Sequence, residues 1–130
     1  VLEVGTGSGY QAAVLSGLVK QVYSVEIVPE LATSAAEVLG RLGYSNVKVR
    51  AGDGYAGWPE HAPFDGIIVT AAAEEIPAPL LQQLKPGGKL VIPVGAEHGY
   101  QELLLVEVDD NGEVRERSML PVRFVPLTRD

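Results

Sequence analysis

The residues with the most obvious chemical use are three glycines at alternate positions near the start of the chain. Gly5, Gly7 and Gly9 follow the apolar segment 1–4 and open a segment that reads as a helix over 9–18. A buried parallel strand that ends in glycines and turns into a helix brings bare backbone close to a ligand. The unpaired N–H groups and positive dipole end of the helix point to the same place. The pattern favours a nucleotide-like cofactor, although short glycine runs also form plain turns.

The spacing of these glycines argues against a dinucleotide. The dinucleotide fingerprint places its third glycine three residues after the second, so that a pyrophosphate sits at the helix N-terminus. Tyr10 holds that position here, and the third glycine comes one residue earlier. A ligand without a pyrophosphate fits this departure better, which disfavours an NAD-dependent oxidoreductase.

Two acidic residues follow the next two predicted strands, 22–26 and 47–51. Glu26 lies about twenty residues beyond the glycine turn, the spacing at which a carboxylate binds ribose hydroxyls. Asp53 follows Gly52 and can accept a hydrogen bond from an exocyclic amine such as that of adenine. Each acid alone is also compatible with an ordinary loop. Ligands of open α/β sheets bind outside the carboxyl ends of the strands, however, and all three features fall there.

Strand and helix patterns alternate along the chain, which predicts an α/β fold with a doubly wound, Rossmann-like, mostly parallel sheet. A helix is predicted to begin at Pro29 and to stop at Gly43. Its predicted apolar face holds Leu31, Ala35, Val38, Leu39 and Leu42. A short helix is predicted to end at Leu84, with 85–88 as a turn into the next strand. Apolar segments on both sides of 109–112 predict a C-terminal antiparallel hairpin.

Length and composition limit the classes of protein to which the chain can belong. The 130 residues are expected to form a single domain, 1–130, around one core. A net charge of −7 disfavours binding to nucleic acid. No apolar run is long enough to cross a membrane, and no metal-ligand cluster is visible. The chain has no cysteine, which fits a cytoplasmic protein, and we expect a monomer.

Five stretches of the chain resemble one family. They are the segments 1–13, 52–55, 64–73 and 84–95, and the ending 125–128. Together they resemble S-adenosylmethionine-dependent methyltransferases and, more narrowly, the protein-L-isoaspartate O-methyltransferase family. The first stretch is shared by many methyltransferases, whereas the alanine triplet and the Val-Pro-Leu-Thr ending are more specific. The resemblance covers essentially the whole chain.

The resemblance implies a class I methyltransferase that repairs damaged proteins. It would move a methyl group from S-adenosyl-L-methionine to the α-carboxyl of L-isoaspartyl residues and leave S-adenosyl-L-homocysteine. The implied cofactor-binding residues are Gly5, Thr6, Gly7, Ser8, Gly9, Glu26, Gly52, Asp53 and Thr128. Thr70, Ala71 and Ala72 are implied to line the boundary with the isoaspartyl substrate. The alternatives are a class I methyltransferase with another acceptor, or an inactive cofactor-fold binding module.

The family also carries a segment before the first motif, with a hydroxyl residue near the reacting carboxylate. The present sequence starts inside the first predicted strand, so we expect it to be part of a longer protein. No catalytic residue is therefore assigned. We expect these 130 residues alone to be inactive.

The predicted hairpin tip holds the pair Asn111 and Gly112. Glycine does not shield its backbone nitrogen, which can attack the asparagine side-chain amide and form a succinimide. We therefore expect the tip to age into an isoaspartyl site, unless a rigid turn prevents the attack.

Overall fold

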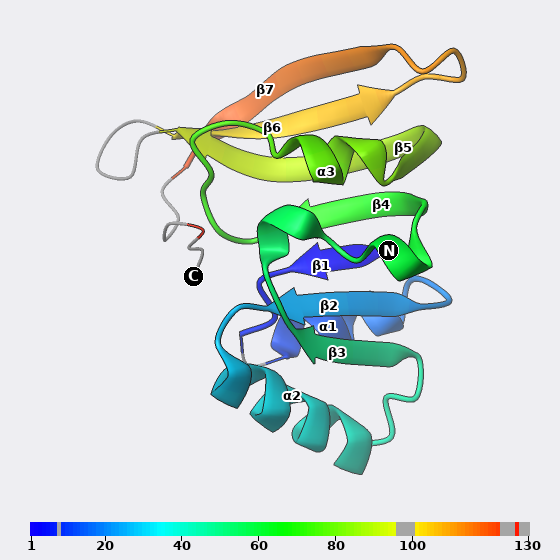
Figure 1. Cartoon of the computed structure of the whole chain (residues 1–130), viewed down its shortest axis with the longest axis vertical. Helices are drawn as coiled ribbons and strands as arrows, with labels where there is room; N and C mark the ends of the chain where they lie inside the picture. The colour runs from blue at the N-terminus through cyan, green and yellow to red at the C-terminus, as the bar shows by residue number, and fades with distance from the viewer. Residues whose placement is uncertain (8, 96–100, 123–126, 128–130) are drawn as a thin grey trace.

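The computed structural model describes residues 1–7, 9–95, 101–122 and 127, and within them the chain forms one sheet flanked by helices (Figure 1). The strands are β1 (Leu2–Val4), β2 (Val22–Glu26), β3 (Val47–Ala51), β4 (Phe64–Val69), β5 (Leu84–Gly95), β6 (Gln101–Val108) and β7 (Val114–Val122). The helices are α1 (Tyr10–Ser16), α2 (Pro29–Arg41) and α3 (Ala78–Gln82), with the 3₁₀ turns η1 (Gly54–Ala56) and η2 (Pro59–His61).

The described strands lie in the order β3-β2-β1-β4-β5-β6-β7. Strands β1 to β5 pair in parallel, whereas β5 with β6 and β6 with β7 are antiparallel. This confirms the predicted mostly parallel sheet with a C-terminal hairpin. The chain leaves β1 toward β2 and β3 on one side and later returns to β4 on the other. Such a reversal opens a crevice at the carboxyl ends of the strands, next to β1.

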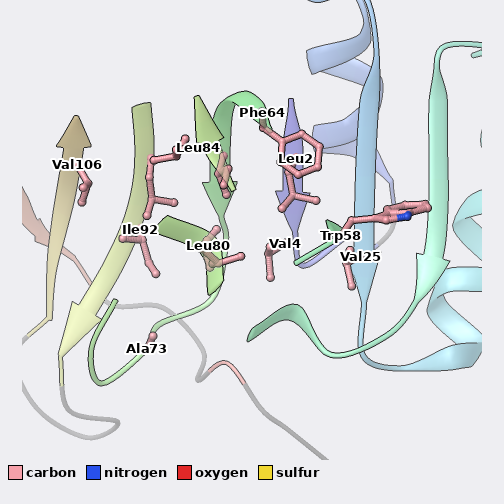
Figure 2. Packing of buried hydrophobic residues seen from close by; sticks show 13 residues of the cluster. Leu2, Val4, Val25, Trp58, Phe64, Ala73, Leu80, Leu84, Ile92 and Val106 are labelled. Atoms are coloured by element: carbon pink, nitrogen blue, oxygen red, sulfur yellow. The ribbon is translucent and has the colours of Figure 1, made fainter. Parts of the chain in front are cut away.

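Strand β1 sends its side chains alternately to the two faces of the sheet, and other elements pack against both faces. Leu2 and Val4 belong to the larger core cluster, together with Phe64 of β4 and Leu80 of α3 (Figure 2). A smaller cluster on the opposite face joins α1, α2 and β2 through Ala12, Leu15, Leu39 and Val22. Figure 1 shows α1 behind the sheet and α3 in front of it. The residue between Leu2 and Val4 is Glu3, which is fully buried.

Helix α2 begins at Pro29 as predicted, but only Ala35 and Leu39 of its predicted apolar face are buried. The residues that it buries are Ala32, Ala35 and Leu39. Leu31, Val38 and Leu42 are 43%, 37% and 69% exposed. Small alanines let the helix lie close to the sheet, so the larger side chains point along its flanks. One flank faces the carboxyl edge of the sheet and the other faces α1.

Three predicted boundaries were wrong. Helix α3 ends at Gln82 and not at Leu84, which is the first residue of β5. Helix α1 ends at Ser16 and not near 18, because the N–H groups of Gly17 and Leu18 donate to the carbonyls of Val14 and Leu15 in a tighter last turn. Segment 85–88 is an irregular start of β5 and not a separate turn. A register shift on β4 between Phe64 and Gly66 absorbs this irregularity. None of the described helices is long and apolar enough to span a membrane.

Candidate functional site

The glycine loop after β1 has the backbone that the sequence pattern predicts. Gly5, Gly7 and Gly9 have φ angles of 102°, 56° and 92°, a region in which other residues are strained. A Cβ on Gly5 would also lie 2.5 Å from the Thr70 hydroxyl oxygen. Gly9 is the N-cap of α1, so the loop delivers the chain directly into the helix. The first and second glycines lie at the carboxyl ends of the strands.

Glu26, the last residue of β2, holds this loop in place. One carboxylate oxygen accepts a hydrogen bond from the Gly7 N–H at 2.8 Å, and the other accepts from the Val28 N–H at 3.1 Å. The side chain is buried, with the residue 7% exposed. Each carboxylate oxygen has a second lone pair, so Glu26 can still accept hydrogen bonds from a ligand.

A cavity of about 340 Å³ opens at this edge of the sheet. Its size is within the range of small-molecule sites. Its lining residues are Val4, Gly5, Gly7, Val25, Glu26, Ile27, Val28, Leu31, Gly54, Thr70, Ala71 and Leu127. Most of them come from the ends of β1, β2 and β4 and from the segment after β3, whereas Leu31 belongs to α2 and Leu127 lies near the C-terminus. Three of the predicted cofactor-binding residues and two of the predicted substrate-binding residues therefore face one cavity.

Gly52 and Asp53 lie beside the cavity but do not line it. The Gly52 N–H donates to the Glu26 carbonyl at 2.9 Å, and the Asp53 carboxylate accepts from the Tyr55 N–H at 2.9 Å. Asp53 thereby caps η1 and places Gly54 against the cavity. A Cβ on Gly54 would overlap Val4, so this close approach needs a glycine.

A buried glutamine fixes the segment that carries η1. Gln83 donates from Nε2 to the Ala56 carbonyl at 2.8 Å, and its Oε1 accepts from the Trp58 N–H at 2.9 Å. Gln83 is 7% exposed, and both of its polar atoms have partners in the segment. The wall that Gly54 forms is therefore tied to the end of α3.

Thr70 joins the floor of the cavity to the glycine loop. Its hydroxyl donates to the Gly5 carbonyl at 2.9 Å. Ala71 lines the cavity, whereas the Ala72 carbonyl accepts from the Leu127 N–H at 2.7 Å. Ala73 pairs with β5 through the Pro93 carbonyl at 3.0 Å. The structure thus brings Thr70 and Ala71 to the cavity and places Ala72 just behind it.

Two predicted site residues, Ser8 and Thr128, lie outside the described residues. Leu127, which directly precedes Thr128, lines the cavity. Thr6 is buried, with 3% exposure, and contacts Ser24 rather than the cavity. Among the described residues, no group of three or more histidine, cysteine, aspartate and glutamate side chains could hold a metal ion.

Sequence reasoning missed the apolar wall formed by Ile27, Val28 and Leu31. Ile27 and Val28 form the turn into α2, and Leu31 lies in its first turn. Their apolar side chains carry no chemical signal in the sequence. The helical pattern placed Leu31 in the core, whereas the side chain is 43% exposed and lines the cavity.

A comparison with models of protein families shows to which family the chain belongs. The family model described as protein-L-isoaspartate(D-aspartate) O-methyltransferase matches residues 1–130. The chain belongs to this family. A curated family member, protein-L-isoaspartate O-methyltransferase 2 of Syntrophobacter fumaroxidans, is 66% identical over 128 residues, which are 98% of this chain and 52% of that protein. Protein-L-isoaspartate O-methyltransferase 2 of Polaromonas sp. is 60% identical, with 98% of this chain and 61% of that protein covered.

Solved structures of the family have the same arrangement. One, named protein-L-isoaspartate O-methyltransferase, superposes with a TM-score of 0.91 at 35% identity, over 98% of this chain and 41% of its own. Another, from Plasmodium falciparum in complex with S-adenosyl-L-homocysteine, has a TM-score of 0.81 at 28% identity and covers 99% and 65%. The chain spans about half the length of the curated family members that it matches.

Proposed function

We propose that the protein is a repair enzyme that moves a methyl group from S-adenosyl-L-methionine to the α-carboxyl of L-isoaspartyl residues in damaged proteins. The observation that carries the proposal is the cavity at the strand ends, lined by Gly5, Gly7 and Glu26, in a chain of the isoaspartate methyltransferase family. The S-adenosyl-L-homocysteine in a structural neighbour supports the choice of cofactor. In this proposal residues 1–130 are a single cofactor-binding methyltransferase domain.

The residues around the cavity suit the parts of such a cofactor. The loop from Gly5 to Gly9 would surround the methionine part, and the free lone pairs of Glu26 would accept the ribose hydroxyls. Gly52 and Asp53 would meet the adenine beside Gly54. Thr128 would close one side of the pocket, which the position of Leu127 against Ala72 supports.

The reaction needs alignment more than acid–base help. S-adenosyl-L-methionine supplies an electrophilic methyl on a sulfonium, and in the transfer the S–C bond breaks as a C–O bond to the carboxylate forms. The acceptor carboxyl has an ordinary pKa near 4 and is already ionised at neutral pH. The small side chains of Thr70 and Ala71 leave room for the two reacting groups, and the apolar residues Val28 and Leu31 keep water away from them. The backbone nitrogen then attacks the ester carbonyl and releases methanol to form a succinimide, which water reopens partly as normal aspartate.

The proposed partners are isoaspartyl-containing proteins and peptides. A net charge of −7 does not favour nucleic acid as a substrate. We place the protein in the cytoplasm as a monomer, and a sequence without cysteine supports a reducing compartment.

Methyl transfer to a matched pair of peptides tests the proposal. The full-length protein that contains residues 1–130 is incubated with S-adenosyl-L-methionine labelled in the methyl group and with one peptide in its isoaspartyl and its aspartyl form. We expect a base-labile label on the isoaspartyl peptide alone. No transfer, or equal transfer to both peptides, would contradict the proposed function.

A further inference from the structure

Gln83 is a buried polar residue that the chemistry above does not use. It directly follows α3, is 7% exposed and is not among the residues that line the cavity. Its neighbour Leu84 belongs to the larger core cluster. A side-chain amide in such a place costs free energy unless its polar atoms are hydrogen-bonded, whereas a leucine side chain has no such requirement. The partners of the amide therefore indicate what Gln83 does.

Both polar atoms of this amide bind the backbone on the two sides of Gly57. Nε2 donates to the Ala56 carbonyl at 2.8 Å, and Oε1 accepts from the Trp58 N–H at 2.9 Å. Gly57 has a φ of 64°, and a Cβ added there would overlap the Gln83 side chain. The two hydrogen bonds resemble those between neighbouring strands, with one side chain in place of a strand. Gln83 thus holds the end of η1 at two adjacent peptide groups.

The backbone that Gln83 holds leads directly to the cavity. The Gly57 N–H donates to the Gly54 carbonyl at 3.2 Å, and the Ala56 N–H donates to the Asp53 carbonyl at 3.0 Å. Gly54 lines the cavity, and Asp53 caps η1 at its start. Because one turn of 3₁₀ helix separates the two ends, a shift at Gly57 is transmitted to the cavity wall.

Arg50 of β3 is a second anchor of the same segment. Its Nη2 donates to the Gly57 carbonyl at 3.2 Å, and the guanidinium carbon lies 4.5 Å from the centre of the Trp58 ring. The Arg50 side chain is 35% exposed, however, and its ion pair with Glu60 lies at the surface. Exposed ion pairs contribute little to stability, and water competes for their hydrogen bonds. Gln83 is therefore the more buried of these two anchors.

The backbone of Gln83 is fixed independently of its side chain. Its N–H donates to the Leu80 carbonyl of α3 at 3.2 Å, and its carbonyl accepts from the N–H of Phe64, the first residue of β4, at 2.7 Å. Leu80 and Phe64 both belong to the larger core cluster. The side chain therefore extends from a rigid base, as a positioning group requires.

We propose that Gln83 is a positioning residue for the adenine side of the cofactor pocket, where its amide fixes η1 so that Asp53 and Gly54 meet the ligand in the binding geometry. The inference rests on the cofactor binding proposed above, since it concerns the same pocket. Gln83 acts through the backbone of η1 and not by contact with the ligand. A wall that is already ordered in the free protein lowers the entropy that binding must remove.

The first test compares Gln83→Leu with Gln82→Leu, an exposed position one residue earlier, in the full-length protein that contains residues 1–130. Gln83→Leu leaves the Trp58 N–H and the Ala56 carbonyl without this partner. In the free protein, we expect amide exchange at Ala56 and Gly57, whose N–H groups do not contact Gln83, to rise about tenfold. In calorimetry, S-adenosyl-L-homocysteine should bind about tenfold more weakly. Gln82→Leu should leave both quantities unchanged.

Gln83→Glu tests the hydrogen bonds with almost no change of shape. A protonated carboxyl can donate to the Ala56 carbonyl and accept from the Trp58 N–H, whereas a carboxylate can only accept. We expect this variant to bind S-adenosyl-L-homocysteine as the wild type does at about pH 5.5 and at least about tenfold more weakly at about pH 9. The ratio of the two affinities isolates the new carboxyl, because both proteins share the ionisable side chains of the anchored segment and its second anchor: Arg50, Asp53, Tyr55, Glu60 and His61.

A role of Gln83 in folding alone would not give these results. Wild-type exchange and affinity in Gln83→Leu would overturn the proposal, as would a ratio of affinities in Gln83→Glu that is the same at both pH values. If Gln83→Leu does not fold, the pH profile of Gln83→Glu decides. If the wild-type protein does not bind S-adenosyl-L-homocysteine at all, the proposed function fails, and exchange at Gly57 in the free proteins still decides whether Gln83 holds the wall.

Discussion

At the scale of single residues, Glu26 does most to define the site. Its two carboxylate oxygens join the loop after β1, at Gly7, to the turn after β2, at Val28. The carboxylate also faces the cavity. One side chain therefore shapes the pocket and offers acceptors to a ligand.

Replacing Glu26 by alanine should weaken binding of S-adenosyl-L-homocysteine by at least about tenfold, because hydrogen bonds to a charged group contribute about 1.5–3 kcal/mol each. Calorimetry measures the loss, and Glu37→Ala on the exposed side of α2 is the matched control. Equal affinity in the two variants would remove Glu26 from the site.

The second residue-scale prediction concerns stability. The folded-state pKa of Glu3, about 7, lies above its ordinary value of 4.5. The folded protein therefore binds the proton more tightly, and the stabilisation present below about pH 4.5 is lost as the pH rises to about 7. Relative to Glu3→Gln, the free energy of unfolding of the wild type should fall by about 3 kcal/mol over this interval. Denaturant titrations at several pH values measure it, and parallel pH profiles for the two proteins would refute the raised pKa.

At the scale of elements, the loop between β1 and α1 depends on backbone conformations that glycine alone adopts easily. Gly5 combines a φ of 102° with a close neighbour, the Thr70 hydroxyl. Gly43, after α2, has a φ of 85° and open space around it. The pair separates the cost of backbone strain from the cost of a steric clash.

Gly5→Ala should therefore destabilise the protein more than Gly43→Ala. Strain at a positive φ costs of the order of 1 kcal/mol in each variant, and the contact with Thr70 adds about 1–2 kcal/mol to the first. Thermal unfolding of both variants measures the difference. Equal losses would mean that Thr70 does not press against the loop.

The β6–β7 hairpin gives the second prediction at this scale. The Asp109 carboxylate accepts from the N–H groups of Asn111 and Glu113, both at 2.9 Å, and its carbonyl accepts from the Gly112 N–H at 3.0 Å. The nitrogen that would attack the Asn111 side chain is thereby held by the turn, so deamidation is expected to be slow.

Asp109→Ala should speed deamidation of Asn111 severalfold, because it removes two of the hydrogen bonds that fix the turn. Mass spectrometry of aged samples follows the conversion, with Asp110→Ala as control. If the rates in wild type and Asp109→Ala agree, the turn does not protect the site.

At the scale of the whole molecule, the sequence predicted the sheet and the place of the site because the alternation of strands and helices and the spacing of the glycines are local patterns. It predicted neither the hydrogen bond between Glu26 and Gly7 nor the hydrogen bonds of the Ser24 hydroxyl with Glu3 and Thr6. These contacts join residues about twenty positions apart and depend on the register of β1 with β2. The sequence also misplaced the buried face of α2. The small side chain of Ala32 is buried, but alanine marks a core position less clearly than the larger apolar residues Leu31 and Leu42, which are exposed.

The central claim is that the strand ends form one cofactor site. Titration of the protein with S-adenosyl-L-homocysteine, followed by amide chemical shifts, tests it most directly. We expect the largest changes at Gly5, Gly7, Val28 and Gly54, which come from three separate loops of the cavity. Changes confined to the groove between α1 and α2, around Val14 and Leu42, would contradict the account, as would no change at all.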